Sequence, residues 1–189
     1  MKIQFIRTGF VDYVSRAFRD DGCVVQVPGY GGRFKPPHDY GHYLVERVYA
    51  PAHGLWGIIA AGAIWGDMQL LVGRRPPHSA ERSKIIMRMA DEAHTSCEQL
   101  VCAFQRITDE KLDNDWRASK AVFDEYLDYR TTSRPKTLEE VQRVCADFRD
   151  AAQQWSQVPV SGAVTVSWKT AVSGRDRRFA LPKKHARAR

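Results

Sequence analysis

The stretch Tyr13–Val27, YVSRAFRDDGCVVQV, decides the fold class of this 189-residue chain. Two segments typical of strands, Tyr13–Arg19 and Cys23–Val27, flank the sequence Asp20-Asp21-Gly22. Asp-Gly is a strong signal for a tight turn, because glycine adopts the positive φ that such turns require. We therefore predict a β-hairpin near the N-terminus.

Two further strands are predicted at the ends of the chain. Ile3 and Phe5 alternate with polar neighbours, and Val164, Val166 and Trp168 fall on one face of an extended segment. An isolated strand must pair with another one. We therefore expect one small, mainly antiparallel sheet that joins the N-terminal strands to the C-terminal strand.

Helical patterns fill the middle of the chain, so the expected fold class is α+β, with the sheet packed against about five helices. Thr137-Leu138-Glu139-Glu140 is typical of a capping box at a helix start. The expected helices cover residues 38–49, 54–72, 79–107, about 112–127 and 138–155. The length of the chain suits a single domain, and a content of 43% hydrophobic residues is enough to build its core. We therefore expect one domain over residues 1–172, followed by a basic tail at 173–189.

Residues 54–72 are apolar almost all round and raise the question of a membrane segment. The run is interrupted by Asp67 and Gln69, and Gly62 and Gly66 form a G-x-x-x-G spacing that permits close helix packing. We therefore predict a central buried helix rather than a membrane partner. A further hypothesis is that this helix lines a pocket for a lipid or a quinone-like molecule.

The positive charge is concentrated at the C-terminus. The chain carries a net charge of +7, and residues 175–189 hold seven basic residues and one acidic residue, a net +6. Such a cluster attracts nucleic acid or an acidic partner, although a solvated tail without a partner has the same composition. The composition predicts that this tail is disordered.

The cysteines indicate a reducing compartment. Cys23, Cys97, Cys102 and Cys145 form no C-x-x-C pair, and the N-terminal segment has the pattern of a strand rather than of a secretory signal. We therefore expect free thiols and a cytoplasmic location.

The most specific chemical signal is the predicted helix that begins at His38. His38, His42 and Glu46 are spaced four residues apart and so project from one helix face. Two imidazoles and a carboxylate are ligands that suit a divalent metal, zinc above all. Asp39 is a candidate catalytic residue, as a proton acceptor or as a group that orients a histidine. Aspartate in place of the zincin glutamate argues against a peptidase of that class.

Other interpretations of these residues stay open. His38 can cap the helix, His42 can be a structural histidine and Glu46 can pair with Arg47 or with a lysine. A metal-free pocket for binding or acid–base chemistry is a further alternative.

The remaining histidines offer few further candidates. His94 and Glu98 are candidates for further ligands, because they too are four residues apart. His53 and His78 stand at helix boundaries, which is typical of caps or exposed side chains.

The run Pro37-His38-Asp39-x-x-His42-x-x-Val45-Glu46, followed by Gly54-Leu55-Trp56-Gly57, resembles a family of uncharacterised bacterial proteins. The resemblance extends over about residues 1–168 and implies no particular activity. The H-D-x-x-H segment is also similar to that of ubiquinone-biosynthesis proteins linked to zinc. This second resemblance covers only His38, Asp39 and His42, and this chain has Gly54 where those proteins carry a further glutamate.

Two functional hypotheses follow. The first is a metal-binding protein, and more specifically a metal-dependent hydrolase acting on an unknown small molecule, with His38, His42 and Glu46 as ligands. The alternative is a non-enzymatic binding protein whose residues 175–189 contact nucleic acid or an acidic partner.

Overall fold

The computed structural model describes residues 1–29, 35–49, 53–75, 77–128, 131 and 133–169. In this part of the chain, five strands and five helices form an α+β fold, as predicted. In chain order the elements are β1 (Lys2–Arg7), β2 (Tyr13–Phe18), β3 (Val24–Pro28), α1 (His38–Tyr49), α2 (Leu55–Ala60), β4 (Gln69–Val72), α3 (Ser79–Asp109), α4 (Trp116–Tyr126), α5 (Leu138–Ser156) and β5 (Ala163–Ser167).

The strands form one antiparallel sheet in the order β4-β3-β2-β1-β5. The β2–β3 hairpin turns at Gly22, whose φ of 81° is the conformation that favours glycine. At the other end of the chain, β5 pairs with β1 and places Val164 opposite Phe5. The prediction that the C-terminal strand joins the N-terminal strands is confirmed.

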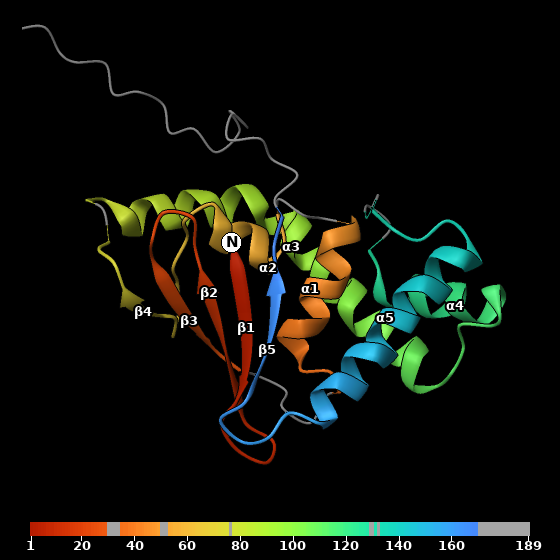
Figure 1. Ribbon diagram of the computed structural model, residues 1–189. Coiled ribbons are helices and arrows are strands. Elements are labelled where there is room, and N and C mark those ends of the chain that lie inside the picture. Colours follow the sequence, from red (N-terminus) through yellow and green to blue (C-terminus); the bar gives the residue numbers. More distant parts are fainter. Residues whose placement is uncertain (30–34, 50–52, 76, 129–130, 132, 170–189) are drawn as a thin grey trace, which may run out of the picture.

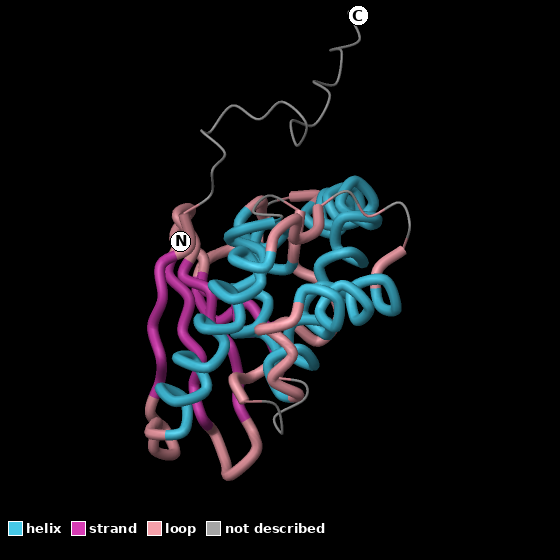
Figure 2. The backbone as a smooth tube through the Cα atoms, turned by 90° about the vertical axis from the view of Figure 1, so that its right-hand side faces the viewer, coloured by secondary structure: helices cyan, strands magenta, loops and turns pink. Residues whose placement is uncertain are grey.

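All five helices lie on one side of the sheet, as Figure 2 shows. The side chains that alternate toward them, among them Ile3, Phe5, Ala17 and Val25, are fully buried. Burial of this apolar face against the helices provides the main stabilisation of the two layers.

Helix α1 lies between the sheet and α5 (Figure 1). The ring of Tyr40 stacks on Phe5 of β1 at a centroid distance of 4.5 Å, and the fully buried Trp56 meets the same phenylalanine edge-on. On its other side, Gly41 lets α1 approach Val101 closely, because a Cβ at this glycine would lie 3.1 Å from that side chain. Helix α1 is therefore packed against the sheet on one side and against α3 and α5 on the other.

The prediction of a single helix over residues 54–72 is wrong. Helix α2 ends at Ala60, and the chain then passes through Gly62 and Gly66, with φ values of 108° and 54°, before it enters β4. These glycines break the helix because they adopt the left-handed region that a helix excludes. The long helix that was expected to line a lipid or quinone-like pocket is therefore not formed. None of the described helices is long and apolar enough to span a membrane.

The other helices agree with the sequence patterns. The side chain of Thr137 accepts a hydrogen bond from the Glu140 backbone N–H, as expected of a capping box. The Glu140 carboxylate accepts from the N–H of Lys136, one residue earlier than the usual partner. All four cysteines are free, as predicted. The basic tail lies outside the described residues and stays a prediction.

Candidate metal site

The candidate site lies where α1 packs against α3. His38 and His42 project from α1, with ring centroids 4.8 Å apart, while His94 and Glu98 project from α3. Each pair is spaced by four residues, so each helix presents its two polar side chains on the same face. The packing brings together two motifs that are more than fifty residues apart in the sequence.

Glu98 is the carboxylate on which the histidines converge. Its Oε1 lies 3.2 Å from Nε2 of His42 and 3.8 Å from Nε2 of His94, and its Oε2 lies 3.6 Å from Nε2 of His38. One ligand atom each from His38, His42 and Glu98 can be chosen so that all three lie within 4.8 Å of one another. These three residues form the candidate metal site.

These separations are compatible with a divalent metal ion. Zinc binds nitrogen and oxygen ligands at about 2.0–2.2 Å, so two ligand atoms on a tetrahedral ion are roughly 3.3 Å apart. The two contacts of 3.2 and 3.6 Å to Glu98 are close to that value. The third pair of ligand atoms belongs to His38 and His42 and lies within the same 4.8 Å limit.

His42 is the most strongly positioned of these residues. Its side chain is 1% exposed, and its Nδ1 lies 2.8 Å from Oε1 of Glu46, in hydrogen-bonding range. If His42 is neutral and carries its proton on Nδ1, the lone pair of Nε2 faces the candidate site. Nε2 lies close to Glu98 but makes no hydrogen bond, because the contact lacks the required alignment. A buried ring nitrogen that faces a carboxylate without a hydrogen bond is an arrangement into which a metal ion would fit.

Glu46 is itself fixed by the start of α2. Its Oε1 accepts a hydrogen bond from the backbone N–H of Leu55 at 2.6 Å, and its Oε2 accepts one from that of Trp56 at 2.9 Å. The approach depends on Gly54, where an added Cβ would lie 2.1 Å from Cδ of Glu46. The carboxylate is fully buried and contacts Nδ1 of His42, the ring nitrogen that does not face Glu98.

Asp39 is bound to the sheet. It is 4% exposed, and its Oδ2 accepts a hydrogen bond from the Ser15 hydroxyl of β2 at 2.7 Å. Its backbone carbonyl accepts from the indole N–H of Trp56 at 3.0 Å. Burial raises the pKa of Asp39 to about 6, against the opposing effect of the Ser15 hydrogen bond. A catalytic role for Asp39 stays a prediction.

The electrostatics of the metal-free protein centre on His42. Burial disfavours its charge, but the hydrogen bond with Glu46 and the contact with Glu98 outweigh burial and raise the pKa of His42 to about 10. Burial likewise acts against ionisation of Glu98, whose pKa the contacts with His42 lower to about 2. The pKa of His38 is lowered by burial and by the charge of His42. The contacts with Glu46 and Glu98 therefore favour the charged form of His42 in the metal-free protein.

The structure brings together two of the three predicted ligands. His38 and His42 share the site, but the third position belongs to Glu98, while the oxygens of Glu46 accept from His42 and from backbone N–H groups. Glu46 does not pair with Arg47, which contacts Asp147 instead. The sequence signal for Glu98 was its spacing from His94, although the pattern alone did not reveal that these residues face α1.

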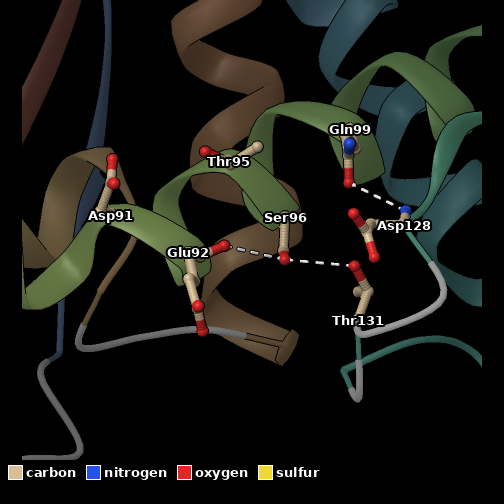
Figure 3. A pocket seen from close by; sticks show the side chains of 7 residues that line it. All are labelled: Asp91, Glu92, Thr95, Ser96, Gln99, Asp128 and Thr131. Atoms are coloured by element: carbon tan, nitrogen blue, oxygen red, sulfur yellow. Dashed lines mark hydrogen bonds between the residues drawn. The ribbon is translucent and has the colours of Figure 1, made fainter.

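In the described part of the chain, cavities open along α3. One, of about 280 Å³, borders the candidate metal site and is lined by His38, Val101, Cys102, Gln105, Arg106, Asp109, Glu110 and Tyr126. The other, of about 320 Å³, is lined by Asp91, Glu92, Thr95, Ser96, Gln99, Asp128 and Thr131 (Figure 3). In the second cavity the Ser96 hydroxyl donates to the Glu92 carbonyl and lies 3.2 Å from the Thr131 hydroxyl.

Comparison with protein-family models, with curated proteins and with solved structures gives no significant match for this chain. The resemblance to an uncharacterised bacterial family therefore stays a prediction.

Proposed function

We propose that this protein binds a divalent metal ion, zinc above all, through His38, His42 and Glu98. The observation that carries the proposal is the buried His42 side chain, whose Nδ1 is held by Glu46 and whose Nε2 faces Glu98 without a hydrogen bond. Metal-binding histidines in proteins are commonly oriented in this way by a carboxylate on the far ring nitrogen.

The ligand set favours a catalytic rather than a structural metal. Structural zinc sites have four protein ligands, whereas catalytic ones have three and keep a position for water or substrate. Here three protein ligands meet beside a cavity that His38 also lines. A zinc ion held by His38, His42 and Glu98 would supply Lewis-acid activation of water, so we propose a metal-dependent hydrolase.

Glu46 has a positioning role in this proposal rather than the role of a ligand. It fixes the ring orientation of His42 and favours the tautomer in which Nε2 can coordinate. Asp39, whose Oδ2 accepts a hydrogen bond from Ser15 of β2, is retained as a proposed proton acceptor.

A competing interpretation is a metal-free ion-pair network of His42 with Glu46 and Glu98. This network has the same charges as the proposed metal site without an ion. Only a measurement of metal binding therefore distinguishes the two interpretations. Zinc must displace the Nε2 proton of His42, and its affinity should therefore fall as the pH is lowered.

The decisive experiment is zinc titration of the chelator-free full chain, followed by a competing chromophoric chelator. We expect one zinc per chain, with binding abolished in His42→Ala and strongly weakened in Glu98→Gln. The matched control is His78→Asn, since His78 is exposed at the start of α3 and asparagine tolerates its positive φ of 61°. Equal zinc binding by the wild type and Glu98→Gln, or no binding by either, would refute the site.

A further inference from the structure

The cavity of about 280 Å³ beside His38 shares a wall with the proposed metal site. Glu98, Cys102, Gln105 and Asp109 follow one another at intervals of four, three and four residues, so they occupy one face of α3. A helix rises 1.5 Å per residue, which places Asp109 roughly 16 Å along the axis from Glu98. One helix face thus runs from the metal site to a carboxylate at the far end of the cavity.

The single arginine of this cavity is already paired. Nε of Arg106 lies 3.0 Å from Oε1 of Glu110, and its Nη1 lies 2.9 Å from Oε2 of Glu125. An anionic ligand would therefore have to compete with two carboxylates for this guanidinium.

Asp109 is in the opposite situation. Its Oδ1 accepts a hydrogen bond from the side-chain amide of Gln105 at 3.0 Å, and no lysine or arginine among the described residues pairs with it. The cavity wall thus carries an excess of negative charge at the end distant from His38. Val101 and the ring of Tyr126 also line the cavity and offer apolar contact.

We propose that this cavity binds a substrate with a metal-coordinating group at the His38 end and a cationic amine at the Asp109 end, joined by an aliphatic segment. The inference rests on the proposed metal site and extends it by naming the substrate class. The ammonium group would meet the Asp109 carboxylate, whereas a carboxylate or phosphate at the same place would be repelled by Asp109 and would have to compete for Arg106 with Glu110 and Glu125.

The test uses three hydroxamates with six-carbon chains, because a hydroxamate coordinates zinc and the far end of the chain can be varied. The probes are 6-aminohexanohydroxamate, uncharged hexanohydroxamate and the monohydroxamate of adipic acid. Binding to the zinc-loaded full chain is measured by calorimetry at low ionic strength. We expect the amine to bind about fivefold more tightly than the uncharged probe, with the anionic probe weakest.

Two variants assign this preference to one residue. Asp109→Asn should remove the advantage of the amine and leave the affinity of hexanohydroxamate unchanged. Asp91→Asn, which removes an exposed carboxylate from the same helix but from the other cavity, should keep the wild-type order.

The outcomes separate the two proposals. Anionic binding as tight as that of the amine, or an amine preference that survives in Asp109→Asn, would overturn the substrate class. Zinc binding without any hydroxamate binding would overturn the cavity assignment alone. Absence of zinc binding would overturn the metal site on which both depend.

Discussion

Replacement of Glu46 by glutamine is the most informative single perturbation of this protein. The change keeps the size of the side chain but replaces one oxygen by an amide nitrogen. Glu46 Oε1 faces both the Nδ1 of His42 and the N–H of Leu55, and Oε2 accepts from the N–H of Trp56. Whichever way the amide is placed, its NH₂ group meets at least one of these donors.

The cost follows from burial. Glu46 is fully buried, so a donor left without an acceptor finds no water to replace it, and such a group costs about 1–3 kcal/mol. We expect Glu46→Gln to lower the free energy of unfolding by about 2 kcal/mol. For a protein of this length that corresponds to a fall in Tm of about 4–8 °C.

Metal affinity should fall together with stability. The glutamine no longer holds His42 through a charged acceptor, and loss of such an orienting carboxylate typically weakens metal binding about 10–100-fold. Denaturant unfolding without metal and zinc competition at neutral pH measure the two effects separately.

Glu81→Gln is the matched control, because it removes an exposed carboxylate from the first turn of α3. It should leave both quantities close to those of the wild type. If Glu46→Gln bound zinc as tightly as the wild type and unfolded at the same denaturant concentration, the positioning role of Glu46 would be refuted.

Three further perturbations have defined outcomes. In Gly54→Ala, the new methyl group overlaps Glu46, so we expect a loss of about 1–3 kcal/mol in denaturant unfolding and weaker zinc binding; unchanged values would contradict this close approach. Thr137→Ala removes the acceptor for the Glu140 N–H and should cost about 1 kcal/mol in thermal unfolding, with zinc affinity unaffected. Deletion of residues 174–189 should abolish any salt-dependent binding of duplex DNA or RNA measured by fluorescence anisotropy, and binding that persists after the deletion would disprove the tail hypothesis.

Most of the sheet was predictable from sequence because its signals are local. The Asp-Gly turn at Gly22 and the alternation around Phe5 and Val164 fix where strands begin and which face is apolar. Strand β4 was missed because its residues continue an apolar run that looks helical from composition alone. Only the backbone at Gly62 and Gly66 shows where that run changes from helix to strand.

The candidate site was predictable to the extent that it lies within one helix. Spacing alone places His38 and His42 on the same face of α1. Spacing also makes Glu46 look like their natural partner, because the backbone N–H groups that occupy its carboxylate belong to another element. Glu98, and not the predicted Glu46, provides the carboxylate of the candidate site because α3 packs against α1. No local sequence pattern encodes that packing.

A crystal structure of the zinc-loaded full chain, with anomalous data collected at the zinc edge, tests the central claim most directly. We predict one strong anomalous peak about 2.0–2.2 Å from ligand atoms of His38, His42 and Glu98, with Glu46 still bound to Nδ1 of His42. A peak coordinated by Glu46, a peak elsewhere on the chain, or no peak between α1 and α3 would contradict it.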